Sequence, residues 1–346
     1  MKKVYWIILL ICLSMSAWGW NSMLLEGLIR PSILIVHQDR IFVLDQTTVF
    51  IFRLEDGRLI RKFGKAGEGP GEFKYLGNNG RPLSMSFQKN RLAVNSVNRI
   101  TWFSQDGVYE GERNLPVDML LFEIGEQYIG VGPINDEKEQ SQKIGFRFYD
   151  RNIRPGSLIY RSELDVGNPS KLMIPADSFA YNPVYRNRIY INTDPEEFVI
   201  DVFDSDGKKL YQIAREAERI PVDEEYRKMT LHFFEVHPRW KRMAEMLKRI
   251  TVFRDYFPRI RDLHLASERI HVFTYRRNGD DWEMLVLDLK GNPLARLWVP
   301  LSEYEPFSLY PLLYSVSGNS LYSLVEEDDE EGWQIRRTEI PVPYTR

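Results

Sequence analysis

The sequence predicts an all-β protein, a six-bladed β-propeller, and two regularities carry this prediction. Four glycines, Gly57, Gly107, Gly156 and Gly207, follow one another at intervals of 50, 49 and 51 residues. Each lies in a polar turn between two apolar, strand-like runs. A repeat of about fifty residues is typical of propeller blades, each of which is one four-stranded sheet. A fifth turn, at Gly291, follows after 84 residues. The excess of about 34 residues indicates an insertion between the fourth and fifth units.

The second regularity gives the number of blades. A short polar stretch, often with arginine, precedes an alternating apolar strand six times along the chain. The six copies begin at Asp39, Asn90, Glu126, Asn187, Glu268 and Asn319. Further apolar runs around each copy complete a meander of four strands. Six such sheets can pack radially into a closed ring, whereas an open solenoid would need caps at its ends.

The last unit is short of sequence for its fourth strand. Its glycine turn is expected near residue 341, and the sequence stops at Arg346. The segment Ser22 to Ile29 precedes the first unit and has no other sheet to join. We therefore expect this segment to form a strand of the last blade and to close the ring.

Residues 1–19 have the composition of a secretory signal peptide. Lys2 and Lys3 precede an apolar stretch, and small residues at Ala17 and Gly19 suit a cleavage site. We expect export to the periplasm or the cell exterior, with residues 20–346 left as the propeller and no membrane span after cleavage. The alternative is an uncleaved anchor, because Val4 to Trp20 reaches the shortest length that spans a bilayer.

Composition excludes several classes of chemistry. Cys12 is the only cysteine, so the processed chain would have no disulfide, no thiol nucleophile and no cysteine-ligated metal. With 43% hydrophobic and 13% aromatic residues, the chain has enough apolar material for a large core. The formal net charge is -3, and it becomes -5 without Lys2 and Lys3. Nucleic acid is therefore not an expected partner.

A glycine-rich segment follows the first unit. From Phe63 to Phe73 the chain reads FGKAGEGPGEF. This segment resembles the loop between blades in NHL-like and TolB-like six-bladed β-propeller proteins of bacteria. The resemblance implies a fold whose members bind partners, with a few enzymes among them. The glycines predict a tight connection with positive φ values. A phosphate-binding loop is not expected, because no Lys-Ser or Lys-Thr follows and no helix begins there.

The inserted segment, about residues 221–258, predicts two short helices. Asp223 is expected to cap the first helix, and Pro238 lies where the second would start. In the second helix one face carries Trp240, Met243, Leu247 and Ile250. Residues 221–261 hold ten Lys or Arg against six Asp or Glu. Either the apolar face packs on the propeller and the cations are solvated, or the helices form a lid over the central channel and a basic surface for a partner.

The histidines and the acidic run do not predict a metal site. His37 and His264 fall on or near inner strands of blades one and five, which are not neighbours, and no third histidine joins them. The run Glu326 to Glu331 is expected to be a solvated hairpin tip, with weak Ca²⁺ binding as the alternative. We expect neither a metal nor another cofactor.

These features favour an exported, non-catalytic propeller that binds a protein, a peptide or an envelope glycan through one rim. That rim carries the glycine-rich loop, the insertion and the turns between second and third strands. The candidate ligand-binding residues are Asn95, Asn98, Arg99, Trp240, Lys241, Arg276 and Arg277. The alternative is a metal-dependent hydrolase or lyase with its site at the central channel, because ligands from separate blades leave no linear signature. No residue is predicted to be catalytic.

Overall fold

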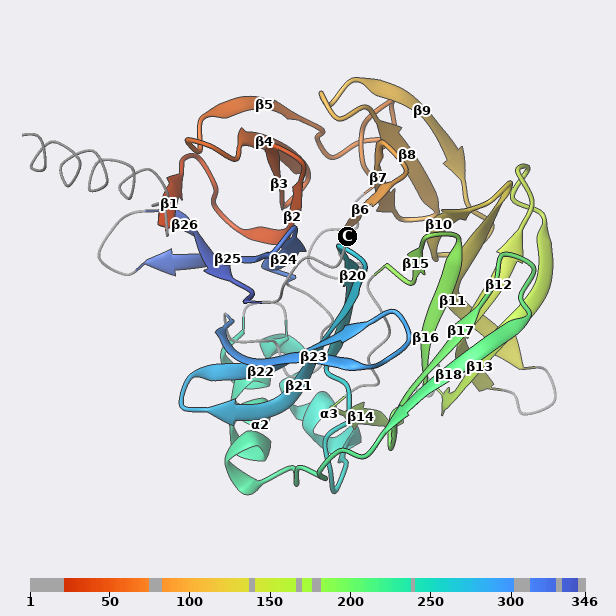
Figure 1. Cartoon of the computed structure of the whole chain (residues 1–346), viewed down its shortest axis with the longest axis vertical. Coiled ribbons are helices and arrows are strands. Elements are labelled where there is room, and N and C mark those ends of the chain that lie inside the picture. Colours follow the sequence, from red (N-terminus) through yellow and green to blue (C-terminus); the bar gives the residue numbers. More distant parts are fainter. Residues whose placement is uncertain are drawn as a thin grey trace, which may run out of the picture.

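Six four-stranded antiparallel sheets surround a common centre in the computed structural model of the chain (Figure 1). The structure describes residues 22–74, 83–136, 141–165, 170–175, 182–237, 240–301, 312–327 and 332–341. The predicted signal peptide, Pro238 and residues 328–331 of the acidic run lie outside the described residues. The predicted all-β, six-bladed propeller is confirmed.

In blades one to five the four strands follow one another in chain order from the centre outward. Blade one contains β2 (Pro31–His37), β3 (Arg40–Asp45), β4 (Thr48–Arg53) and β5 (Leu59–Phe63). Blade two contains β6 (Ser84–Gln88), β7 (Arg91–Ser96), β8 (Arg99–Phe103) and β9 (Tyr109–Asn114). Blade three contains β10 (Leu120–Ile124), β11 (Gln127–Asp136), β12 (Ser141–Tyr149) and β13 (Pro155–Asp165).

The second half of the ring repeats this order. Blade four contains β15 (Val184–Tyr185), β16 (Arg188–Asp194), β17 (Phe198–Phe203) and β18 (Lys209–Arg215). Blade five contains β20 (Asp262–Ala266), β21 (Arg269–Asn278), β22 (Asp281–Asp288) and β23 (Pro293–Pro300). Blade six contains β24 (Tyr314–Ser317), β25 (Ser320–Glu327), β26 (Gly332–Glu339) and, from the other end of the chain, β1 (Ser22–Leu25).

Burial explains why the middle strands read as continuous apolar runs. In β3 and β4 nearly every residue is buried, because a neighbouring blade packs on each face of the sheet. The fourth strands β5 and β9 lie at the perimeter and are largely exposed. Only the first three strands of these two blades therefore carry the strong hydrophobic signal.

Hydrophobic clusters between adjacent blades hold the ring together. Leu34 of blade one and Leu324 of blade six share one cluster. The pairs Ile51 and Leu92, Ala93 and Leu121, Ile129 and Ile189, Ile200 and Ile270, and Val286 and Leu321 mark the other five interfaces in order around the ring. Every interface between blades is thus an apolar core, and burial of these faces is the main stabilising term of the fold.

The predicted closure by the N-terminal segment is confirmed. β1 pairs antiparallel with β26, and Ser22 lies opposite Arg336 while Leu25 lies opposite Trp333. The strand is shorter than the segment from Ser22 to Ile29, because the chain turns after Leu25 and Gly27 adopts a φ of 83°. Leu25 is buried in the cluster between blades six and one.

Four of the five predicted glycine turns join third to fourth strands. Gly57, Gly107, Gly207 and Gly291 have φ values of 68°, 72°, 81° and 90°, a conformation that other residues adopt rarely. The prediction for Gly156 is wrong, because this residue lies in β13 and Ile153 takes the left-handed position with a φ of 61°. Asp150 Oδ1 accepts hydrogen bonds from the N–H groups of Asn152 and Arg154 and so stabilises the turn without glycine.

The glycine-rich loop connects blade one to blade two as predicted, and the positive φ values are confirmed at Gly64 and Gly71. Phe73 at its end is fully buried between the two blades. Glu72 accepts a hydrogen bond from the Gly69 N–H at 2.9 Å and forms an ion pair with Lys65. These contacts fold the loop back on itself. Residues 75–82 lie outside the described part.

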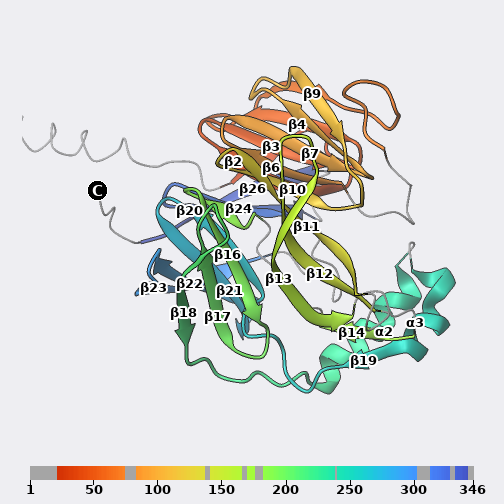
Figure 2. The ribbon, with the colours of Figure 1, turned by 90° about the vertical axis from the view of Figure 1, so that its right-hand side faces the viewer.

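The predicted insertion lies between blades four and five. It contains α2 (Glu224–Val236), the 3-10 helix η2 (Lys241–Met243), α3 (Ala244–Ile250) and β19 (Thr251–Phe253). Asp223 caps α2 as predicted, since its Oδ1 accepts from the Tyr226 N–H at 2.8 Å. The strand β14 (Leu172–Ile174), from the connection between blades three and four, pairs in parallel with β19. Figure 2 shows these helices and strands grouped at one end of the molecule.

The insertion has a small core of its own. Ile174, Phe234, Ala244 and Leu247 are buried together, with Trp240 and Ile250 partly buried against them. Met243 is 37% exposed, so its predicted place on the buried face is wrong. The apolar stripe therefore packs mainly within the insertion and against β14, and not on the blade cores.

Candidate functional site

A cleft of about 510 Å³ lies between the insertion and blade five, and we call it the rim cleft. One wall is formed by α2 with Tyr226 and Met229, and the floor by Phe257 and the residues around it. Tyr275, Arg276 and Arg277 at the end of β21 and Trp282 at the start of β22 form the opposite wall. These residues flank a turn between a second and a third strand. The rim cleft therefore lies on the rim that the sequence analysis proposed for ligand binding.

Aromatic rings line this cleft in a continuous series. The Phe257 and Tyr275 rings stack with centroids 4.4 Å apart and an interplanar angle of 22°. Tyr226 meets Phe257 edge-on at 4.8 Å, and Tyr275 meets Trp282 edge-on at 6.4 Å. Burial raises the pKa of Tyr226, so its hydroxyl stays protonated at neutral pH. The cleft thus presents rigid, amphipathic rings, which contribute much of the contact area at protein interfaces.

Two guanidinium groups stack on Trp282 of the rim cleft. The Arg261 guanidinium carbon lies 3.7 Å from the ring centroid and that of Arg277 lies 4.6 Å from it. Arg261 is fully buried, whereas Arg277 is exposed. Cation–π contacts of this kind fix the planes of both arginine side chains. Arg277 therefore holds its charge at the cleft mouth in a restricted orientation.

The rim cleft carries a small positive excess. Its lining includes the cations Arg219, Arg261, Arg276 and Arg277 and the acids Glu218, Asp223 and Glu225. Arg276 forms ion pairs with Glu218 and Glu283, and Asp223 is engaged as the cap of α2. Of the three acidic lining residues, Glu218 is thus in an ion pair and Asp223 is a helix cap, which leaves Glu225. A ligand with a carboxylate next to an aromatic or aliphatic group matches this balance.

The predicted site residues do not form one cavity. Arg276 and Arg277 line the rim cleft, but Trp240 and Lys241 of the insertion do not. Trp240 is partly buried in the core of the insertion, and Lys241 is exposed on η2. Two of the seven predicted ligand-binding residues therefore line the rim cleft.

The three predicted residues of blade two support the propeller. Asn95 is buried and its Oδ1 accepts a hydrogen bond from the Leu121 N–H of blade three at 3.3 Å. Asn98 is exposed in the turn after β7, with a φ of 52°. Arg99 is buried, donates to the Glu68 carbonyl at 3.2 Å and pairs with Glu112 at 3.1 Å. Arg99 therefore anchors the glycine-rich loop.

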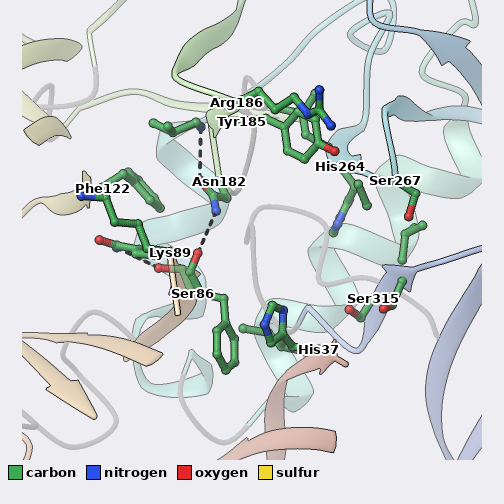
Figure 3. A pocket seen from close by; sticks show the side chains of 18 of the residues that line it. His37, Ser86, Lys89, Phe122, Asn182, Tyr185, Arg186, His264, Ser267 and Ser315 are labelled. Atoms are coloured by element: carbon green, nitrogen blue, oxygen red, sulfur yellow. Dashed lines mark hydrogen bonds between the residues drawn. The ribbon is translucent and has the colours of Figure 1, made fainter. Parts of the chain in front are cut away.

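A second and larger cavity, of about 880 Å³, lies at the centre of the ring, and we call it the central pocket (Figure 3). The first strands of all six blades contribute to its wall. Its mouth includes Lys89, Gly125, Arg186, Ser267 and Gly318, which lie in or next to turns between first and second strands. The central pocket therefore opens on the rim opposite to the insertion, and no described residue of the insertion lines it.

A buried carboxylate holds one histidine of the central pocket. Asp262 Oδ2 lies 3.2 Å from His264 Nε2 and accepts a hydrogen bond from the Tyr314 hydroxyl. Burial opposes ionisation of Asp262, but the His264 imidazole, the Tyr314 hydroxyl and the Leu263 N–H together lower the pKa of this carboxyl group. Asp262 is therefore ionised at neutral pH and fixes the orientation of the His264 ring.

His37 lies across the same pocket. Its ring stacks on Phe87 with centroids 4.1 Å apart and an interplanar angle of 12°. Burial lowers the pKa of His37, which keeps the imidazole neutral at pH 7. Its Nε2 is buried with no hydrogen-bond partner among the described residues. A buried polar atom of this kind normally binds water or a ligand.

Among the described residues, no group of three or more His, Cys, Asp or Glu is placed to hold a metal ion. No helix among those residues is both long enough and apolar enough to cross a membrane.

Comparison with known proteins agrees with the sheet topology. A family described as 6-bladed beta-propeller matches residues 26–238, more than half of the chain. The chain belongs to this family. No curated protein matches it. Among 531 matching chains of solved structure is the crystal structure of the computationally designed Ika4 protein. That chain is 12% identical with a TM-score of 0.30, and the alignment covers 54% of the present chain and 99% of Ika4.

The sequence predicts the central channel of this 6-bladed beta-propeller only as an alternative site, and it predicts none of the lining residues to bind a ligand. His37 and His264 lie on the inner strands of blades one and five as predicted, and both line the pocket. The cavity is built from one short strand per blade, so its residues are separated by about fifty positions in the sequence. The polar residues at the ends of first strands, such as Gln88 and Lys89, were the only local signal.

We expect the propeller to lose stability in mild acid through His271. Its ring is fully buried in β21, and burial, together with the charges of His264 and Arg269, lowers its pKa from 6.5 to about 3. Between these values the unfolded chain binds a proton that the folded chain does not, so stability falls as pH drops below 6.5. The contribution is about 1.4 kcal/mol per pH unit.

The pH effect can be measured by urea unfolding at pH 7.0, 5.5 and 4.5. His271→Leu should have a flatter profile than the unchanged protein, with a difference of about 2–3 kcal/mol accumulating by pH 4.5. His232→Ala, at an exposed position of α2, is the matched control and should keep the original slope. An unchanged slope in His271→Leu would exclude His271 as the source.

Proposed function

We propose that this chain is an exported, non-catalytic binding module that holds a protein or peptide of the cell envelope in the rim cleft. The observation that carries the proposal is the aromatic and arginine lining of this cleft, with Trp282 and Arg277 at its mouth. Trp, Tyr and Arg are the residue types that contribute most to protein interfaces. The resemblance of the glycine-rich loop to NHL-like and TolB-like propellers, whose members bind partners, supports a binding role. The composition of residues 1–19 supports export.

The charge of the cleft specifies the partner further. Arg277 is exposed and oriented by Trp282, and the lining has four arginines against three acidic residues. An extended acidic segment with an aromatic or aliphatic side chain would place a carboxylate at Arg277 and its apolar group on the Phe257 and Tyr275 rings. The location on connecting segments agrees with the general concentration of binding residues on loops.

The proposal is tested by capture from envelope extracts with immobilised protein. Binding to the identified partner should weaken at least about tenfold in Arg277→Ala, since truncation of an arginine at the centre of an interface costs about 2 kcal/mol or more. Lys290→Ala, exposed in the turn between β22 and β23 on the opposite rim, is the control and should bind normally.

The nature of the partner is decided by treatment of the extract. Protease treatment should abolish capture and periodate oxidation of sugars should not. The opposite result would replace the protein partner by a glycan. Equal capture by Arg277→Ala and the unchanged protein would remove the rim cleft from consideration.

A further inference from the structure

The central pocket has the dimensions and lining of a ligand site that is independent of the rim cleft. Its volume of about 880 Å³ is within the usual range of small-molecule sites. It opens on the opposite rim, and the two cavities share no lining residue. A ligand held there would not compete with a partner on the insertion.

The charges of the central pocket cancel. Lys89 and Arg186 are its cations, apart from histidine, and Glu123 and Glu126 are its acids. Lys89 Nζ lies 3.5 Å from Glu123 Oε2, and Arg186 Nε lies 2.6 Å from Glu268 Oε1. Because both cations already have carboxylate partners, a charged ligand would gain little and would lose its hydration. A neutral ligand is favoured.

The polar groups of the pocket both donate and accept hydrogen bonds. Hydroxyls come from Ser86, Ser267 and Ser315, an amide from Asn182 and imidazoles from His37 and His264 (Figure 3). Hydroxyls, amides and the neutral imidazole of His37 each have a donor and an acceptor, as do the hydroxyl groups of sugars. This lining matches a molecule with many hydroxyl groups better than one with a single anionic or cationic group.

Two histidines on separate blades supply oriented groups. Asp262 engages Nε2 of His264, which leaves Nδ1 as the ring nitrogen available to a ligand. The His37 ring lines the pocket and is fixed by the stack on Phe87; because its Nε2 is enclosed by protein, Nδ1 is the nitrogen left to a ligand. Figure 3 shows His37 and His264 on different sides of the opening, with Asn182 and Lys89 across from them. A bound molecule can therefore be contacted from several blades at once.

We propose that the central pocket binds a neutral saccharide, with His37 and His264 as its main hydrogen-bonding residues. The juxtaposition of two fixed imidazoles, a ring of hydroxyl and amide groups, and charges that are already paired is the basis of this assignment. Asp262 acts as a positioning residue, since it does not line the cavity itself but contacts His264 and Tyr314, which do. The affinity expected for such a site is modest, with a dissociation constant of about 1 mM for a short oligosaccharide.

The test is a titration of the full protein with ¹⁵N-labelled histidine, followed by NMR of the imidazole groups. The probes are neutral di- and trisaccharides of glucose, galactose, mannose, xylose and N-acetylglucosamine, with glucuronate and inorganic phosphate as charged comparisons. At least one neutral sugar should shift the His37 and His264 signals saturably, while the exposed His232 on α2 stays unchanged. The charged probes should bind at least about tenfold more weakly.

Variants keep the proposal testable if one substitution perturbs the fold. His37→Ala and His264→Gln should each weaken the sugar at least about tenfold, whereas His232→Ala should not. The NMR titration of the unchanged protein needs no variant. Absence of any shift at His37 and His264 up to about 50 mM of every neutral sugar would overturn the proposal. Binding of glucuronate or phosphate as tight as the best neutral sugar would overturn it as well.

Discussion

Leu25→Ala should destabilise the propeller by about 2–5 kcal/mol, the range for truncation of a buried leucine. Leu25 is 1% exposed in the cluster that joins blades six and one, although it belongs to a four-residue strand near the N-terminus. Its strand β1 supplies the outer edge of a blade whose other three strands come from the far end of the chain. A cavity at Leu25 therefore weakens the contact that closes the ring. Urea unfolding followed by far-UV circular dichroism measures this loss.

Leu24→Ala is the matched control for the closing strand. Leu24 is 41% exposed on the same strand, so its truncation should cost about 1 kcal/mol or less. Deletion of residues 1–25 should destabilise far more than deletion of residues 1–21, because it also removes β1 and uncovers the edge of β26. An uncovered edge strand pairs with other chains, so the shorter protein should self-associate in size-exclusion chromatography. Equal stability of the two deletion variants would show that closure does not depend on β1.

The number and order of blades could be predicted because each blade repeats one hydrophobic pattern. The repeat in β3 and β4 is strong because both faces of these strands are buried. The turns between third and fourth strands were predicted from the glycine positions, and this prediction is wrong at Gly156. Ser104, Asp150, Asp204 and Asp288 each accept hydrogen bonds from N–H groups two and four residues later in the turn between third and fourth strands. The turn of blade one has Gly57 without such a cap and the turn of blade three has the cap without glycine, so either feature is sufficient for this turn.

The site could be predicted only where it lies on one stretch of chain. Arg276 and Arg277 could be predicted because they are adjacent in the sequence, at the end of β21 and next to a turn on the rim with the insertion. Arg99 also lies next to a polar turn in the sequence, so it was expected to be exposed like Arg276 and Arg277. In the structure it is buried against Glu68 and Glu112, because the glycine-rich loop folds over it. Phe257 of the insertion stacks on Tyr275 of blade five, and Arg261 lies over the Trp282 ring. No spacing rule gives such contacts, so they could not be predicted from the sequence.

Removal of the insertion should abolish partner binding while the propeller still folds. The two ends of the insertion are already paired, since the Val222 N–H donates to the Asp255 carbonyl and the Phe257 N–H donates to the Ile220 carbonyl, both at 2.9 Å. Replacing residues 223–254 by a short Gly-Ser turn would therefore close an existing ladder. The lost core of Phe234, Ala244 and Leu247 is separate from the clusters between blades.

The shortened protein also needs a change in β14. Ile174 is fully buried against the insertion and would become exposed, so Ile174→Ser should be included to limit aggregation. We expect a strand-rich far-UV spectrum and cooperative unfolding. Capture of the envelope partner should be lost, because Tyr226 and Met229 of α2 form one wall of the rim cleft.

A second variant separates the wall of the cleft from the charge of the insertion. Lys241, Arg242 and Arg249 are exposed, whereas Lys248 is paired with Glu235 and Glu245. Replacing these three exposed cations by alanine keeps both helices and the cleft. If the aromatic and arginine lining carries the binding, this triple variant should lose at most about threefold in affinity, with the loss confined to low salt. Loss of capture in the triple variant would move the binding surface to the basic face of the insertion.

Two outcomes with the shortened protein would contradict the prediction for the insertion. If that protein fails to unfold cooperatively, α2 and α3 belong to the folding core. If it folds and still captures the partner, the binding surface lies outside the insertion.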